Sequence, residues 1–239
     1  MSNEASKYQS GDAPNPMTCG DADVIISPDT LRENRIPPGQ SRTRKWPVLD
    51  ATGTPAIPAD WKLDIFGLVD RPLTFKLDEF RRLPRIKVFA DFHCVTRWSR
   101  LGNLWEGVST RHLIEAAGVR PEAKFVLLHA YDNGWTTNLP LTDFLAPDAL
   151  ITDLHDGEPL SADHGGPMRA IVPMLYAWKS AKWLKGIEFS AEDKLGYWER
   201  GGYHSHGDPW VVDDEHVDGE RFQVPSQIPP GFNDGSDPF

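Results

Sequence analysis

The feature that most constrains this chain is a succession of short apolar segments in which apolar and polar residues alternate. Trp61, Leu63 and Ile65 alternate with Lys62 and Asp64, which is the period of a half-buried strand. Gly, Pro, Asn and Asp fill the gaps between such segments and favour turns. Many short strands with few helices predict an α+β fold with mixed sheets, short helices and long loops.

Further elements follow from local signals. Ser109 and Gly118 are the residue types of a helix N-cap and a helix end, so they predict a helix over 110–117. A second short helix is expected over 77–83 and a loop over 103–107. The other strands are expected over 73–75, 88–94, 124–130, 149–154, 168–172 and 186–189.

Composition divides the chain into three regions. Residues 1–23 are polar and predict a mobile N-terminal tail, and residues 225–239 are dense in Pro and Gly and predict a C-terminal extension. Residues 24–224 predict one domain, long enough to bury a core. Within it, the proline-rich residues 28–60 predict an extended arm rather than a helix.

Charge and hydropathy exclude some partners. The formal net charge is −10, which disfavours nucleic acid and anionic membranes because both repel an acidic protein. The longest apolar run, 170–178, is about half of the ~20 residues that a membrane-spanning helix needs. No secretory signal is recognisable at the N-terminus. We expect no stable membrane insertion, and a cytoplasmic protein as written or a periplasmic one whose export signal was removed.

The arm nevertheless carries a local basic cluster. Its members are Arg32, Arg35, Arg42, Arg44 and Lys45. On an acidic protein this cluster is either an anion contact or a solvated basic patch.

Cys94 ends the expected strand over 88–94 and is the first candidate for chemistry. A thiolate is a strong soft metal ligand, and nearby cations such as Arg97 and Arg100 lower a thiol pKa. On spacing alone, a buried structural cysteine is the simpler interpretation. The other cysteine, Cys19, lies in the polar tail, so the two do not resemble a disulfide framework.

Two later clusters carry donors for an anionic ligand. Residues 163–173 contain two adjacent glycines, which let a backbone approach a ligand closely, together with His164 and Arg169. The next cluster offers Lys179, Ser180 and Lys182. The alternatives are a loop that enters a buried strand and an exposed amphipathic turn.

Three segments in this order resemble the molybdopterin-binding domain of the sulfite oxidase family. They are residues 92–99 (Phe-His-Cys-Val-Thr-Arg-Trp-Ser), 163–169 (Asp-His-Gly-Gly-Pro-Met-Arg) and 179–184 (Lys-Ser-Ala-Lys-Trp-Leu). The resemblance covers roughly residues 30–210. It implies that Cys94 binds molybdenum. It also implies that the cofactor is bound by His93, His164, Arg169, Lys179, Ser180 and Lys182.

Other family loops have counterparts here. Asn34 and Arg35 correspond to an early loop that touches the cofactor in the family. Tyr131 and Asp132 correspond to a segment that lies under the pterin. The Trp198-to-Tyr203 spacing resembles a loop that brings a tyrosine to the metal, with His204 and His206 as possible neighbours.

The resemblance implies two-electron oxygen-atom transfer by molybdenum and molybdopterin, either sulfite-oxidase-like or sulfoxide-reductase-like, with a small oxo donor or acceptor as substrate. Cys94, Tyr203 and Arg97 are the expected catalytic residues. Sulfite oxidases carry Asn-Arg-Arg after the cysteine, where this chain has Thr96-Arg97-Trp98-Ser99-Arg100, so sulfite itself is in question. The family's C-terminal dimerisation domain and haem domain have no counterpart in the sequence, which predicts a monomer with a separate electron-transfer partner.

Two other functions remain open. A zinc-dependent hydrolase would use His204, His206, Asp208 and His216, although their spacing matches no helix-borne ligand pair. A catalytically inert pterin-binding protein would keep the same cofactor motifs.

Overall fold

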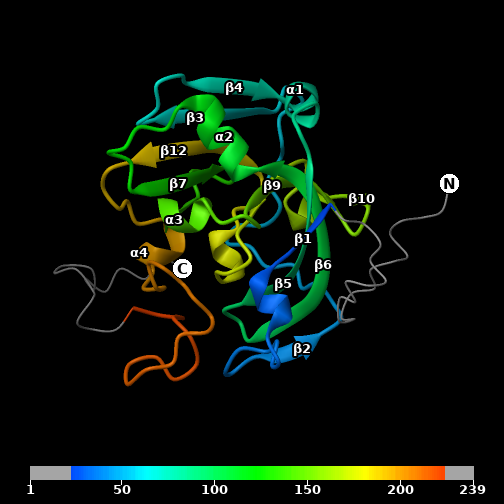
Figure 1. Cartoon of the computed structure of the whole chain (residues 1–239), viewed down its shortest axis with the longest axis vertical. Helices are drawn as coiled ribbons and strands as arrows, with labels where there is room; N and C mark the ends of the chain where they lie inside the picture. The colour runs from blue at the N-terminus through cyan, green and yellow to red at the C-terminus, as the bar shows by residue number, and fades with distance from the viewer. Residues whose placement is uncertain (1–22, 224–239) are drawn as a thin grey trace.

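The computed structural model describes residues 23–223, so residues 1–22 of the expected tail and the whole expected extension lie outside it. Two mixed sheets form the fold (Figure 1). The first has the strand order β1-β5-β6-β9-β10, with β11 beside β9 and β2 beside β6. Its strands are β1 (Val24–Ile26), β2 (Ser41–Thr43), β5 (Ile86–Cys94), β6 (Trp98–Ser109), β9 (Leu150–His155), β10 (Glu158–Pro159) and β11 (Arg169–Ile171).

The second sheet has the strand order β4-β3-β12-β7-β8. Its strands are β3 (Lys62–Gly67), β4 (Leu73–Lys76), β7 (Phe125–Ala130), β8 (Thr136–Pro140) and β12 (Leu184–Ser190). The β3–β12 pair is parallel and the other pairs of this sheet are antiparallel. The expected α+β class with mixed sheets is confirmed.

Short helices cover the second sheet, and Figure 1 shows α2 and α3 across its face. The helices are α1 (Leu77–Arg81), α2 (Thr110–Ala117), α3 (Leu141–Phe144) and α4 (Tyr197–Arg200), with 3-10 turns η2 (Pro28–Leu31), η3 (Ala162–His164) and η4 (Ala177–Lys179). As predicted, the Ser109 side chain caps α2 by accepting from the Arg111 amide, and Gly118 ends it with φ 65°. No helix in the described range is long and apolar enough to cross a membrane.

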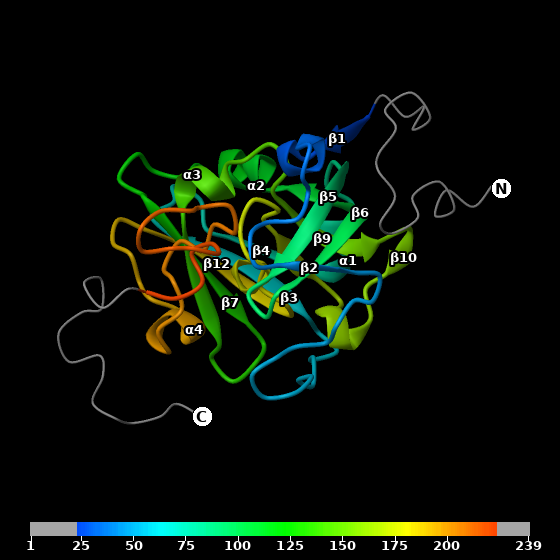
Figure 2. The same cartoon turned by 90° about the horizontal axis from the view of Figure 1, so that it is seen from below.

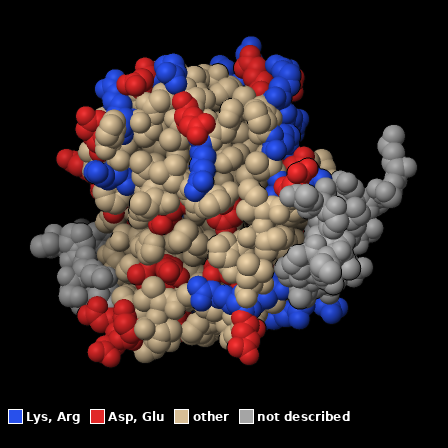
Figure 3. All heavy atoms as spheres, viewed as in Figure 1, with Lys and Arg blue, Asp and Glu red and all other residues tan. Residues whose placement is uncertain are grey.

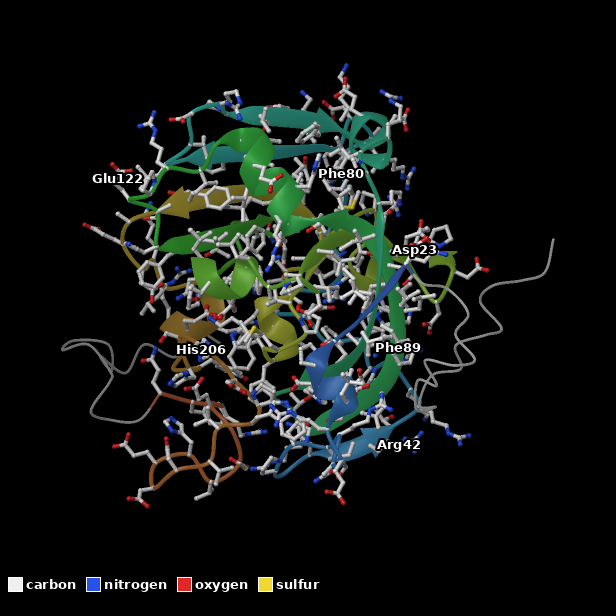
Figure 4. All side chains as sticks on the ribbon, viewed as in Figure 1. Asp23, Arg42, Phe80, Phe89, Glu122 and His206 are labelled. Atoms are coloured by element: carbon white, nitrogen blue, oxygen red, sulfur yellow. The ribbon has the colours of Figure 1, made fainter. Side chains whose placement is uncertain are left out.

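The core forms where the two-residue period of the strands buries one face. Leu63 and Ile65 of β3 are fully buried, whereas Lys62 and Asp64 between them are exposed. Phe80 of α1 packs into the same cluster (Figure 4), and burying such a ring contributes about 1.5–3 kcal/mol.

One local prediction is wrong, because the expected loop over 103–107 lies inside β6. That strand is paired on both sides, with β5 and β9. A Cβ at Gly107 would lie 2.1 Å from the Ile151 carbonyl oxygen, so this glycine permits close strand packing rather than a turn. Asn103 is buried and donates its amide to the carbonyls of Ala90 and Arg100.

The proline-rich arm lies along the domain as expected and contains η2 and β2. Figure 2, seen from below, shows the arm and the segment after α4 on the side that faces the viewer. Arg42, Arg44 and Lys45 of the arm are exposed, and Figure 3 shows basic side chains along the lower right edge of the molecule, where Figure 1 places β2.

Candidate active site

A cavity of about 190 Å³ opens at the end of β5. Segments that are distant in sequence line it: arm residues 46–51, the end of β5, residues 132–135, residues 164–183 and residues 198–203. Cavities at such meeting points of loops are the usual location of small-molecule sites.

Cys94 lies at the cavity end of β5, as predicted, and shares a face with Phe92, which also lines the cavity. Its Sγ accepts a hydrogen bond of 3.2 Å from Thr96 Oγ1. Burial raises the pKa of the thiol, and the Thr96 hydrogen bonds together with the Arg221 charge act in the opposite direction. Sequence reasoning missed Arg221 because it lies 127 positions later, in an irregular segment with no recognisable motif.

A basic group forms another wall. The His164 ring stacks on Trp46, with 3.8 Å between centroids and a 4° interplanar angle. Arg169 donates to the His164 and Ser180 carbonyl oxygens, both at 2.9 Å. Burial lowers the pKa of Arg169 to about 9, and burial followed by the Arg169 charge lowers the pKa of His164 to about 4. The guanidinium therefore remains a cation at neutral pH.

Lys182 extends this basic group, and its Nζ donates to the Asp163 carbonyl oxygen at 3.0 Å. Burial, followed by the Arg169 charge, lowers the pKa of Lys182 to about 8. Asp132 also lines the cavity and accepts a hydrogen bond from Thr52. Arg169 is buried and Lys182 half-buried, and cations beside an open cavity favour an anionic ligand. This wall therefore fits the phosphate of a pterin, and the Cys94 thiol in the same cavity fits a soft metal.

The adjacent glycines also permit close packing within the protein. A Cβ at Gly165 would lie 2.9 Å from Lys182 Cβ, and a Cβ at Gly166 would lie 2.4 Å from the Leu160 carbonyl oxygen. Their small size lets these segments of the chain pack together, and a role in approaching a ligand stays a prediction.

Lys179 and His93, both expected at the cofactor, do not line the cavity. Lys179 is fully buried, with its Nζ 2.6 Å from Glu199 Oε1 and 2.7 Å from the Asn138 carbonyl oxygen. His93 points away from Cys94, as adjacent strand residues must, and its Nδ1 lies 2.8 Å from Ser99 Oγ.

Charged residues of the arm and of the turn after Cys94 form ion pairs outside the cavity. Arg35 forms a two-point ion pair with Asp91 at 2.5 and 2.8 Å, and Asn34 accepts from the Ile36 amide. Arg97 pairs with Asp218 at 2.6 Å. Asn34, Arg35 and Arg97 therefore do not line the cavity. Local spacing could not reveal carboxylate partners that are 56 and 121 positions away.

Arg100, the other cation expected near Cys94, has its own carboxylate partner. Its Nη2 donates to Asp156 at 2.9 Å.

The wall beside Cys94 is aromatic. Tyr203 lines the cavity as expected, and its ring centroid lies 5.1 Å from that of Trp198 and 5.4 Å from that of Trp178. Burial, followed by the Cys94 charge, raises the pKa of Tyr203. Six of the nine tryptophans line the cavity. The sequence motifs contain only Trp98, Trp183 and Trp198 of these six, although the high tryptophan content is a signal that could have directed attention to the others.

The zinc alternative finds no support. Across residues 23–223, no group of three or more His, Cys, Asp and Glu side chains is arranged to hold a metal ion. His206 (Figure 4) instead bridges two carboxylates, with Nδ1 2.7 Å from Glu220 and Nε2 3.1 Å from Asp143.

This bridge predicts a pH-dependent contribution to stability. The two carboxylate hydrogen bonds raise the pKa of His206 to about 10, so its stabilisation is complete below about pH 6.5 and is lost as pH rises through about 10. We expect His206→Gln to lower the free energy of unfolding by about 1–3 kcal/mol at pH 6, after a discount for its partial exposure. Urea titrations should show a large difference in the free energy of unfolding between wild type and His206→Gln at pH 6, and a small difference at pH 10.5.

The matched control is His112→Gln, which changes a half-exposed histidine of α2. An equal loss of unfolding free energy in both variants would contradict a stabilising role of the His206 bridge. A loss in His206→Gln that grows with pH would also contradict it.

Known proteins resemble this chain over most of its length. The family description "Oxidoreductase molybdopterin binding domain" matches residues 51–198. The uncharacterized oxidoreductase YuiH of Bacillus subtilis is 49% identical over 181 residues, which cover 75% of this chain and 91% of that protein. The protein-methionine-sulfoxide reductase catalytic subunit MsrP of Campylobacter jejuni is 28% identical over 200 residues, which cover 72% of this chain and 67% of that protein.

A solved structure shares the fold. The sulfane dehydrogenase SoxCD of Paracoccus pantotrophus matches with a TM-score of 0.55 and 23% identity, over 59% of this chain and 41% of that chain. The family match covers more than half of the chain, and a thiol and a basic group line the same cavity. The chain therefore belongs to the molybdopterin-binding oxidoreductases of the sulfite oxidase family, whose cofactor is molybdenum bound to molybdopterin.

Proposed function

We propose that this enzyme reduces an uncharged organic sulfoxide to a thioether. The observation that carries the proposal is the composition of the wall around Cys94, where Val95, Trp178, Trp198 and Tyr203 pack together. Such a surface favours an apolar or aromatic substrate with one polar group.

The positions of the two arginines that follow Cys94 argue against sulfite. An ion that leaves water for a buried site needs a compensating charge, and Arg97 and Arg100 are the cations nearest to Cys94 in the sequence. Their guanidinium groups instead pair with Asp218 and Asp156. A sulfoxide needs only a donor for its oxygen, and the Tyr203 hydroxyl is a donor in the cavity.

The reaction takes two electrons and two protons, cleaves the sulfur–oxygen bond and releases a thioether and water. When bound, the molybdenum–pterin group supplies the two-electron redox change. Cys94 is proposed as the thiolate ligand of the metal. His164, Arg169, Ser180 and Lys182 are proposed to bind the pterin and its phosphate, with Asp132 as a further acceptor at the cavity. The chain thus orients the cofactor and excludes water with its tryptophans.

The similarity to a protein named the catalytic subunit of a methionine-sulfoxide reductase supports both the substrate class and a separate electron-transfer partner. We propose that the protein is periplasmic. Fractionation of the native host would test this location, because the protein should then be found in the periplasmic fraction. The monomeric state remains a prediction.

We expect the protein purified from a molybdopterin-producing host to contain about one molybdenum per chain by elemental mass spectrometry. With reduced benzyl viologen as donor, kcat/KM for methyl phenyl sulfoxide should exceed that for sulfite with ferricyanide by at least about tenfold, which corresponds to 1.4 kcal/mol of transition-state stabilisation. Faster turnover of sulfite would contradict the proposal. Absence of molybdenum, from a host that loads a control enzyme, would leave only the inert alternative.

A further inference from the structure

Lys179 and Glu199 form a buried ion pair that lies outside the cavity. Both side chains are fully buried, and Lys179 Nζ lies 2.6 Å from Glu199 Oε1. Desolvating two charges is unfavourable, so a buried pair often has a role beyond stability, such as fixing one arrangement of the chain.

The carboxylate holds one side of the aromatic wall. Glu199 Oε1 also accepts from Trp178 Nε1 at 3.0 Å and from Thr137 Oγ1 at 2.7 Å. Trp178 lines the cavity and contacts the Tyr203 ring edge to face. A hydrogen bond from a buried indole to a charged acceptor restricts the ring to one orientation.

The ammonium group holds the segment that carries Tyr203. The amides of Gly202 and Tyr203 donate to the carbonyls of Glu199 and Trp198, both at 3.1 Å, so Tyr203 follows Glu199 through a closed turn. On the other side of Tyr203, the Ser205 carbonyl oxygen accepts from Lys179 Nζ at 2.5 Å. One ammonium group therefore binds the chain on both sides of the tyrosine.

Close packing leaves this arrangement little freedom. A Cβ at Gly196 would lie 2.4 Å from Glu199 Oε2, and a Cβ at Gly207 would lie 2.8 Å from Trp178 Cζ2. The carboxylate and the indole thus lie directly against backbone that only glycine permits.

We propose that Lys179 and Glu199 are positioning residues that orient Trp178 and Tyr203 beside Cys94 and thereby set the affinity for the sulfoxide. Lys179 then acts on the cavity through Glu199 and Ser205, rather than by binding the pterin. The part of this inference that concerns the substrate rests on the proposed function; the part that concerns orientation does not.

Two double variants test the proposal. Lys179→Met/Glu199→Leu and Lys179→Met/Glu199→Gln both remove the two buried charges, but only glutamine keeps an acceptor for the Trp178 indole. With methyl phenyl sulfoxide, KM should rise about tenfold or more in the leucine variant, with kcat within about twofold, and should rise by less in the glutamine variant, which keeps the Trp178 acceptor but loses the Lys179 bond to Ser205. The Mo(V) electron paramagnetic resonance spectrum should change most in the leucine variant. Molybdenum content should be unchanged in both.

A wild-type KM and a wild-type spectrum in the leucine variant would overturn the proposal. Loss of molybdenum from both variants would indicate that Lys179 binds the cofactor instead. If the wild type reduces no sulfoxide but the spectrum changes most in the leucine variant, the proposed function fails and the positioning role stands.

A milder pair of variants covers the case in which the leucine variant does not fold. Trp178→Phe removes the indole donor to Glu199, and Trp61→Phe removes an equal 3.0 Å hydrogen bond to the Leu184 carbonyl in the core. Only Trp178→Phe should alter the Mo(V) spectrum. An unchanged spectrum in Trp178→Phe, or the same change in both, would overturn the proposal.

Discussion

Replacing Cys94 with serine is expected to reduce turnover by more than about hundredfold. Changes in groups that merely support a metal ligand cost about 10–100-fold, and this substitution replaces the proposed ligand itself with a harder oxygen donor. The cavity and its basic wall should persist, because serine is of similar size and His164, Arg169 and Lys182 are untouched.

Turnover with reduced benzyl viologen, molybdenum content and visible absorption are the measurements for Cys94→Ser. We expect an altered absorption spectrum even if some molybdenum remains bound through the pterin. The matched control is Cys19→Ser, the same change at the only other cysteine of the sequence, and it should retain full activity. Wild-type turnover in Cys94→Ser would remove Cys94 from the mechanism and leave it a buried structural cysteine.

Lys179→Met is expected to cause the largest loss of stability. It leaves the Glu199 carboxylate buried without its cation, and breaking such a pair costs about 3–5 kcal/mol. A domain of this size should then unfold roughly 6–20 °C earlier. Because the loss comes from an unpaired charge, Lys179→Met/Glu199→Gln should recover most of it.

Urea unfolding of the apoprotein measures this prediction without any contribution from the cofactor. The control is Lys62→Met, which changes a half-exposed lysine whose contact with the Asp60 carboxylate is 3.9 Å long, and a change within about 1 kcal/mol is expected there. A loss below about 1 kcal/mol in Lys179→Met would contradict the prediction.

Sequence alone predicted the parts of this protein that depend on neighbours in the chain. The α2 helix begins and ends where Ser109 and Gly118 predict, because a cap bonds within its own turn. Cys94 lies at the end of β5 and shares a face with Phe92, because strand residues two apart point the same way. The three family motifs also placed His164, Arg169, Ser180 and Lys182 at one cavity.

Tertiary structure decided which charges belong to the site. Lys179, Arg35 and Arg97 each pair with a carboxylate that is between 20 and 121 positions away, and no spacing rule relates such partners. The aromatic wall beside Cys94 has the same origin, since Trp178 belongs to η4, Trp198 belongs to α4 and Tyr203 follows α4. The motifs therefore determined the family and the cofactor through short-range order in the chain. The environment of Cys94, on which the proposed substrate rests, exists only where distant segments meet to bury apolar surface and satisfy buried charges.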